Sequence, residues 1–263
     1  MKNMFLMILF LMSWHVQASG VSAIFIVNGD ASLSYYLDGK KFDGGLNALD
    51  SARNFALNCG DCEVAIFSLS TRARDKASFY RDEKLIVQKN YSRKKSGYRF
   101  EFESKWYKDH TDSRHEHLVL SFFGHELTIH PSVYFSSVKT TYGQSMFIED
   151  MKKFLSGSEV FSLMILSTCQ NGRASNVEKF AGITRFFVGS TINLNLRMIE
   201  VSGLNQAGPW DPEVVAKTIV NESFEEIARI DSTEIGIVSY DLECSDLCPY
   251  LKYRKNKFIG PRD

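Results

Sequence analysis

The sequence predicts an α/β protein in which a mostly parallel, six-stranded sheet is covered by helices on both faces. Short apolar segments alternate along the chain with segments whose apolar residues have helical spacing. Strands that alternate with helices form parallel sheets with two buried faces. The 263 residues, 44% hydrophobic and 24% charged, suffice for a sizeable core. We therefore expect one folded domain over residues 19–263, following a leader at residues 1–18.

The leader is typical of a secretory signal peptide. Lys2 precedes an apolar run, Met4–Met12, and Val16–Ala18 places small residues at the two positions that a signal peptidase recognises. We expect cleavage after Ala18 and export to the periplasm or the medium, with a short membrane anchor as the alternative. No later stretch of about 20 apolar residues occurs, so we expect no membrane contact after cleavage.

The elements of the expected sheet follow in order along the chain. Six apolar segments are expected to be strands: Ser22–Val27, Val64–Leu69, Leu118–Phe123, Phe161–Leu166, Thr184–Val188 and Glu234–Tyr240. Four segments are expected to be helices: Gly45–Leu57, Phe147–Leu155, Asn176–Ala181 and Pro212–Arg229. A β-hairpin insertion is expected at about residues 75–115, with arms at Lys84–Lys89 and Tyr98–Trp106, because the second arm alternates aromatic with charged residues.

Charge and missing motifs exclude several classes of function. The 31 basic and 31 acidic residues cancel, whereas a general nucleic-acid binder needs a basic excess. The chain has no phosphate-binding Walker loop, no Gly-x-Ser-x-Gly elbow and no His-Glu-x-x-His helix, which disfavours nucleotide hydrolases, serine hydrolases and zinc proteases. A histidine-rich stretch at His110, His115 and His117 is expected to be a solvated loop, with a metal site as the alternative.

Four of the five cysteines form two close pairs, Cys59 with Cys62 and Cys244 with Cys248. In an oxidising compartment such pairs form local disulfides. A four-thiolate zinc site and reduced thiols are the alternatives. Pairing within each motif leaves Cys169, and a single thiol in an exported protein is exposed to oxidation unless it is buried or has a function.

Two of the expected strands end in reactive side chains. His125 follows the apolar segment that ends at Phe123, and Cys169 follows the segment that ends at Leu166. If these strands are parallel neighbours, both residues lie at the edge of the sheet where open α/β proteins bind ligands. An imidazole beside a thiol activates it as a nucleophile and supplies a proton to a leaving group. Gly172 permits a tight turn whose N–H groups would hold an oxyanion.

This pattern resembles the caspase-fold (clan CD) cysteine peptidases. A strand that ends at His125, followed later by the sequence Leu-Ser-Thr-Cys-Gln-Asn-Gly over residues 166–172, is similar to the clostripain-like and CHAT-like groups. The resemblance spans roughly residues 20–242 and implies a three-layer αβα caspase-like fold. It implies a cysteine endopeptidase in which Cys169 is the nucleophile and His125 the general acid/base. A peptide or protein would be the substrate; no metal or organic cofactor is implied, although some relatives depend on Ca²⁺.

The resemblance also implies further site residues. The oxyanion would be held by the backbone N–H groups of Glu126 and Cys169. Ser167 stands where clostripain-like enzymes often have an acid that recognises a basic substrate residue. Asp30, at the end of the first expected strand, and Asn193 and Asn195, after the fifth, are the other candidates for the substrate pocket, with polar loop residues as the alternative interpretation.

A second function remains open on the same residues. Glu126 stands where the family usually has glycine, which favours a catalytically silent caspase-fold protein of the cell envelope that binds a partner through the same cleft. An envelope protein unrelated to peptidases is a third hypothesis, and it would hold His125 and Cys169 far apart. The sequence indicates no oligomeric state.

Overall fold

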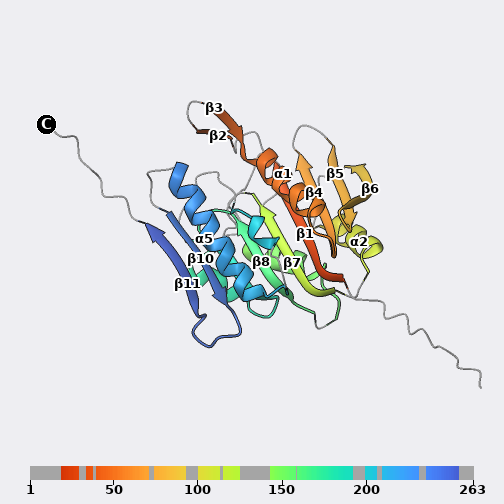
Figure 1. Cartoon of the computed structure of the whole chain (residues 1–263). Coiled ribbons are helices and arrows are strands. Elements are labelled where there is room, and N and C mark those ends of the chain that lie inside the picture. The colour runs from red at the N-terminus through yellow and green to blue at the C-terminus, as the bar shows by residue number, and fades with distance from the viewer. Residues whose placement is uncertain are drawn as a thin grey trace, which may run out of the picture.

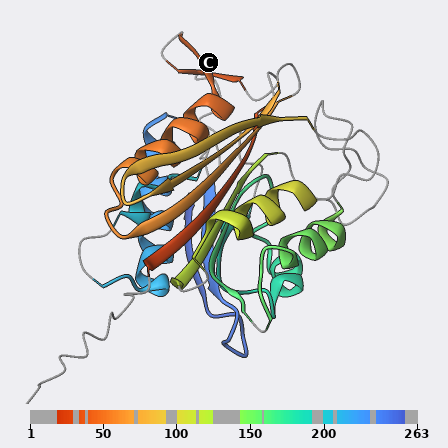
Figure 2. The same cartoon turned by 90° about the vertical axis from the view of Figure 1, so that its right-hand side faces the viewer.

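A large β-sheet lies between two layers of helices in the computed structural model (Figures 1 and 2). The structure describes residues 19–29, 34–37, 40–70, 74–92, 100–112, 115–124, 143–157, 159–191, 199–205, 209–230 and 235–254. The expected α/β fold class, with a sheet covered on both faces, is confirmed, but the sheet has nine described strands rather than six and only its central strands are parallel. No described helix is long and apolar enough to cross a membrane.

Five neighbouring strands run parallel at the centre of the sheet. In sheet order they are β4 (Cys62–Ser70), β1 (Ser19–Gly29), β7 (His115–Phe123), β8 (Phe161–Ser167) and β9 (Thr184–Ser190). Their carboxyl ends share one edge of the sheet, the carboxyl edge, and their amino ends share the opposite, amino edge. Antiparallel strands extend the sheet on both sides: β5 (Asp75–Arg81) and β6 (Lys84–Tyr91) beyond β4, and β10 (Ile235–Asp241) and β11 (Pro249–Arg254) beyond β9. A separate hairpin pairs β2 (Ser34–Leu37) with β3 (Lys40–Asp43).

The parallel strands are apolar because both faces of the sheet are covered. Along β1, Phe25 and Val27 point to one core and Ile24 and Ile26 to the other, as the two-residue period of a strand requires. The first core is closed by α1 (Gly44–Leu57) and α5 (Pro212–Ile230). The second is closed by α2 (Glu101–His110), α3 (Gln144–Lys152), α4 (Ala174–Val177) and the 3₁₀ turn η2 (Glu178–Phe180). Each fully buried aliphatic or Phe side chain contributes about 1.5–3 kcal/mol.

Local sequence signals set the starts of the two helices on the first face. The carboxylate of Asp43 accepts a hydrogen bond from the N–H of Leu46 (3.0 Å) at the start of α1. Asp211 accepts from the N–H groups of Glu213 and Val214 (2.8 and 3.1 Å) at the start of α5. Pro212 occupies the first turn of α5, where its missing N–H costs nothing.

The hairpin insertion is present, but its arms are not the ones expected. The arm Lys84–Lys89 is part of β6, yet its partner is β5, and the two strands are joined at Asp82 and Glu83, both with positive φ. The prediction that Tyr98–Trp106 is a strand was wrong, because α2 occupies residues 101–110. Glu103, Trp106 and Tyr107 are buried on one side of α2, which is helical spacing. The aromatic–charged alternation over Tyr98–Trp106 has the two-residue period of a strand, so it does not indicate the buried face of a helix.

The other departures concern the ends of the sheet. The last expected strand is present as β10, but it runs antiparallel to β9, and β11 then pairs with it as an additional edge strand. Residues of β11 alternate between exposed and half-buried positions, and Lys252 and Arg254 interrupt its apolar signal. The hairpin β2–β3 was also not expected.

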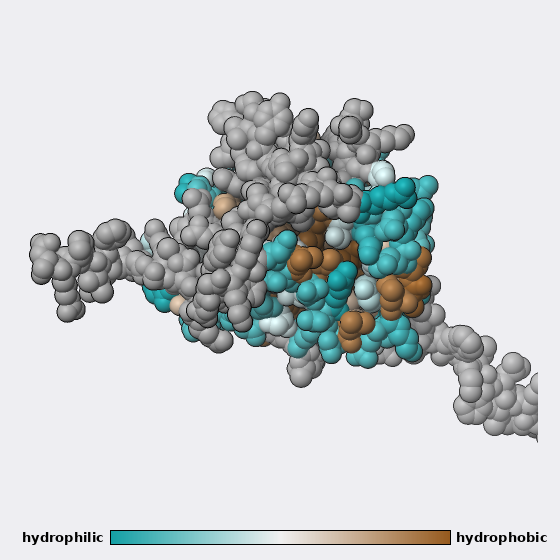
Figure 3. Space-filling view, turned by 90° about the horizontal axis from the view of Figure 1, so that it is seen from above, coloured by the Kyte–Doolittle hydropathy of each residue, from teal (hydrophilic) through white to brown (hydrophobic). Residues whose placement is uncertain are grey.

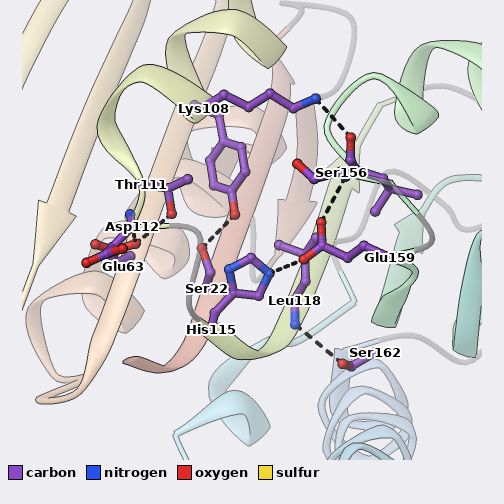
Figure 4. A network of polar contacts seen from close by, with 12 residues as sticks. Ser22, Glu63, Lys108, Thr111, Asp112, His115, Leu118, Ser156, Glu159 and Ser162 are labelled. Atoms are coloured by element: carbon purple, nitrogen blue, oxygen red, sulfur yellow. Dashed lines mark hydrogen bonds and ion pairs between the residues drawn. The ribbon is translucent and has the colours of Figure 1, made fainter. Parts of the chain in front are cut away.

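A polar network joins the amino edge to α2 and to the turn before β8 (Figure 4). The buried carboxylate of Glu63 contacts the guanidinium of Arg81 and accepts hydrogen bonds from Thr111 Oγ1 (2.5 Å) and Asp112 N (2.8 Å). Ser22 Oγ lies 2.8 Å from Tyr107 Oη, whose pKa burial raises to about 12. Glu63 therefore anchors both the β5 strand and the end of α2.

Replacing Glu63 should destabilise the fold. We expect Glu63→Ala to lower the free energy of unfolding by roughly 2–4 kcal/mol, because three donors lose a buried charged acceptor together. Urea denaturation followed by circular dichroism measures this. Glu178→Ala, which removes an exposed carboxylate, is the control and should change stability by less than about 0.5 kcal/mol. Equal effects of the two substitutions would contradict the role of Glu63.

The four paired cysteines stand at two separate places in the sheet. The Cα atoms of Cys59 and Cys62, between α1 and β4, are 5.5 Å apart, and those of Cys244 and Cys248, after β10, are 5.8 Å apart. Both separations are those that a disulfide spans. Four strands lie between β4 and β10, which separates the pairs by roughly 24 Å, so a zinc site built from all four thiols is excluded.

Local pairing predicts a defined thiol count. Unfolded in denaturant without reductant, the protein should expose one thiol, Cys169, to Ellman's reagent, and all five cysteines after reduction. Peptide mapping of the non-reduced protein should find Cys59 linked to Cys62 and Cys244 to Cys248. A link that involves Cys169, or five thiols before reduction, would contradict this pairing.

Candidate active site

The ends of β7 and β8 bring two distant parts of the chain together at the carboxyl edge. The register pairs Phe123 with Ser167, and the N–H of Gly124 donates a hydrogen bond to the carbonyl of Ser167 (3.3 Å). Strand β1 ends on the other side of β7, where Asn28 Cβ is 3.4 Å from the position that a Cβ on Gly124 would take. The chain therefore leaves β7 beside the loop that carries Cys169.

Several predicted site residues lie outside the described residues. These are His125 and Glu126, which directly follow Gly124, and the pocket candidates Asp30, Asn193 and Asn195. Of the predicted site residues at this edge, the structure places Cys169 and Ser167.

Cys169 stands in a turn immediately after β8. It is half-buried and packs against the core that α1 and α5 close, and it is in neither cysteine pair. The next residue, Gln170, has a left-handed backbone with φ 57°, which is uncommon for a residue other than glycine. The turn therefore holds a cysteine in a specific, partly exposed position.

Three buried amide side chains support this turn. Asn171 Nδ2 donates to Thr168 Oγ1 (2.6 Å) and to the carbonyl of Cys169 (3.1 Å), which ties the two sides of the turn together. Asn176 Nδ2, from α4, donates to the carbonyl of Gln170 (3.2 Å). Gln144 Nε2, from α3, donates to the carbonyl of Asn176 (2.7 Å). The carbonyl of Gln170 is thus held from α4, and α4 is itself held from α3.

Gly172 lets the same loop lie directly against β9. A Cβ at this position would stand 2.8 Å from the carbonyl carbons of Gly189 and Ser190, so no larger residue fits without a backbone shift. The N–H of Gly172 donates to the carbonyl of Ser190 (2.7 Å), and its carbonyl accepts from Tyr240 Oη (2.9 Å). Burial raises the pKa of Tyr240, so its hydroxyl remains a donor at neutral pH.

Ser167 is buried, with 2% of its surface exposed, and its hydroxyl accepts a hydrogen bond from the N–H of Ile199 (3.1 Å). This bond ties the segment after β9 to the end of β8. The segment continues through η3 (Ser202–Leu204) on the α5 side of the sheet. Seen from above, the molecule shows apolar patches exposed between polar ones (Figure 3).

The three histidines of the stretch before β7 have separate partners. His110 Nδ1 is 2.7 Å from the carbonyl of Trp106, and His115 Nε2 is 2.6 Å from Glu159 Oε1 (Figure 4). The ring of His117 lies 4.7 Å from that of Trp210. Within the described ranges no three His, Cys, Asp or Glu side chains are grouped as metal ligands.

Sequence reasoning found the cysteine but not its supports. Asn171 stands two residues after Cys169, and its buried role was not inferred. Gln144 and Tyr240 are far from Cys169 in the sequence, and only the packing of α3 and β10 brings them to the loop.

Comparison with known proteins gave matches among solved structures only. No family model matches the chain, and no curated protein matches it. A secreted C11 cysteine protease from Bacteroides thetaiotaomicron, in complex with an irreversible peptide inhibitor, has a TM-score of 0.62 at 12% identity over 85% of this chain. A second structure of a secreted C11 protease from that organism, iotapain, has a TM-score of 0.61 at 12% identity over 86% of this chain.

A third match is an inactive zymogen of a C11 protease from Parabacteroides distasonis, with a TM-score of 0.57 at 11% identity over 86% of this chain. The chain spans 66%, 67% and 62% of these three proteins, respectively, or about two thirds of their length. At this identity the likeness concerns the fold, and it agrees with the expected caspase-like architecture. The chain thus has the fold of the C11, or clostripain-like, cysteine proteases of clan CD.

Proposed function

We propose that this protein is an exported cysteine endopeptidase that hydrolyses peptide bonds with Cys169 and His125. The observation that carries the proposal is the hydrogen bond from Gly124 to Ser167 at the shared ends of β7 and β8. Residue 125 directly follows Gly124, and Cys169 stands two positions after Ser167. Export is inferred from residues 1–18, which lie outside the described residues.

The proposed chemistry uses the thiolate of Cys169 and the imidazolium of His125. The thiolate attacks the carbonyl carbon of the substrate, a C–S bond forms, and the carbonyl electrons move to the oxygen. The N–H groups of Cys169 and Glu126 stabilise this oxyanion. When the oxyanion collapses, the C–N bond breaks and His125 donates its proton to the leaving amine.

Water completes the cycle. Neutral His125 takes a proton from the water molecule, whose oxygen attacks the acyl carbon. The C–S bond then breaks, the carboxylic acid leaves, and the thiolate and imidazolium are restored. These steps use only protein groups and water.

The surroundings of Cys169 support this role. A nucleophile must be held within a fraction of an ångström of its productive position, and side chains fixed by hydrogen bonds provide this better than mobile ones. Asn171 and Asn176 hold the carbonyls of Cys169 and Gln170. The half-buried position leaves part of Cys169 accessible to a substrate.

For the substrate we propose a peptide or protein. Asp30, Asn193 and Asn195 remain the proposed pocket residues. Ser167 is the weakest candidate, because its hydroxyl is buried and engaged by Ile199.

A catalytically silent binding protein is the second candidate function. Glu126 stands where the resemblance expects a glycine whose N–H would hold the oxyanion. A silent protein would keep the cleft and bind a peptide without cleaving it.

Covalent labelling separates the two candidates. The purified protein is treated near neutral pH with a peptidyl acyloxymethyl ketone, and the modified residue is identified by mass spectrometry. We expect modification of Cys169, abolished by Cys169→Ala and slowed at least about 100-fold by His125→Ala, since general acid–base catalysis contributes 10²–10⁴-fold. His117→Ala, on the amino edge of the same strand, is the matched control and should label normally.

Cleavage of a peptide library by the same variants then tests turnover. Labelling and cleavage that both depend on Cys169 and His125 support the peptidase. Labelling no faster than that of an unactivated thiol would contradict it. Peptide binding without cleavage would support the silent protein.

Gly172→Ala tests the role of the loop. The added methyl group meets the backbone of β9 at 2.8 Å, so the loop must move, and we expect labelling of Cys169 to fall at least about tenfold. Gly60→Ala is the control, because the added Cβ would come only within 3.7 Å of Glu83 Oε1, an ordinary van der Waals distance. Unchanged labelling in a folded Gly172→Ala protein would show that the loop position does not determine reactivity.

A further inference from the structure

A cavity lies at the amino edge, on the α1 and α5 side of the sheet and remote from Cys169. It is a half-open cavity of about 580 Å³, within the range of ligand sites. Its described lining comes from the starts of β1, β4 and β7, the turn between α1 and β4, and the segment before α5. The lining includes Gly20, Asn58, Asp61, Glu116, His117 and Trp210.

The charged side chains that line this cavity are acidic, and the guanidinium of Arg185 acts electrostatically on His117 from outside the lining. Asp61 and Glu116 are exposed acidic residues of the lining, which contains no lysine or arginine among its described members. Asp61 Oδ2 lies 3.4 Å from the position that a Cβ on Gly20 would take, and Glu116 Oε1 lies 3.9 Å from His117 Nε2. Helix α1 ends at the cavity through its C-cap, Asn58, without a basic residue in its last turn. Its carbonyl end adds a partial negative charge.

Aromatic rings form another part of the lining. The rings of Trp210 and His117 are 4.7 Å apart. Burial lowers the pKa of His117, so its imidazole is neutral at pH 7 and does not oppose a cation. The indole Nε1 of Trp210 is buried and has no hydrogen-bond partner within the described part of the chain.

We propose that this amino-edge pocket binds the positively charged side chain of an arginine or lysine residue in a peptide. The carboxylates of Asp61 and Glu116 pair with the cation, and the face of Trp210 provides a cation–π contact. The length of β7 from His117 to Gly124 separates this pocket from the catalytic edge by roughly 23 Å, so it is a site distinct from the proposed catalytic one.

Calorimetry with a minimal ligand tests the proposal. Nα-acetyl-arginine amide is titrated at low salt into the full chain carrying Cys169→Ala, which prevents turnover at the carboxyl edge. We expect saturable binding of one ligand. Nα-acetyl-citrulline amide, the neutral isostere, should bind at least about tenfold more weakly, because the charge-dependent part of the affinity is lost.

Paired variants locate the site. Asp61→Asn with Glu116→Gln should weaken binding of the arginine ligand about tenfold or more, and Trp210→Leu should weaken it as well. Glu178→Gln with Glu225→Gln makes the same change in net charge at exposed positions elsewhere and should leave binding unchanged. Circular dichroism confirms that each variant is folded.

Three results would overturn the proposal. They are equal binding of the arginine and citrulline ligands, binding unaffected by the Asp61 and Glu116 variants, and no heat of binding at millimolar ligand. The second result would place an arginine-binding site elsewhere, and none of the three depends on whether Cys169 is catalytic.

Discussion

The parallel pairing of β7 with β8 is the constraint on which the candidate site depends. The register sets Phe123 opposite Ser167, and the hydrogen bond from Gly124 to Ser167 extends the pairing to the last residue before position 125. Buried apolar residues on both faces fix this register, because a shift by one residue would turn every side chain to the opposite core. The core thus determines which loops meet at the carboxyl edge.

The two edges of the sheet have different chemistry. At the carboxyl edge, amide side chains and a close glycine contact hold a cysteine-bearing turn. At the amino edge, Glu63, His115 and Glu159 form polar contacts on the α2 side, and an acidic, aromatic-lined pocket opens on the other side (Figure 4). This separation would allow a chain segment to be held at one edge without obstructing the other.

The sequence predicted the parts of the fold that depend on local apolar pattern. The central strands and the helices after β1, before β8 and before β10 were found because each carries a strong local signal. The α2 segment was misread because its aromatic–charged alternation also fits a helical face. The pairing of β5 between β4 and β6, the edge strand β11 and the direction of β10 depend on tertiary contacts, which no local pattern encodes. Cys169 was identified from its place after a buried strand, whereas Gln144 and Tyr240 reach its loop only through packing.

If the pairing of β7 with β8 places residues 125 and 169 side by side, a short cross-linking reagent should join cysteines at these two positions. His125→Cys is treated, without reductant, with dibromobimane, a short reagent that joins two neighbouring thiols, and the products are mapped by mass spectrometry. We expect a cross-link between position 125 and Cys169 in His125→Cys. We expect no cross-link to Cys169 in His117→Cys, because that thiol stands at the opposite edge of the sheet. Single-site modification of both thiols in His125→Cys, without a cross-link, would contradict the proposed dyad.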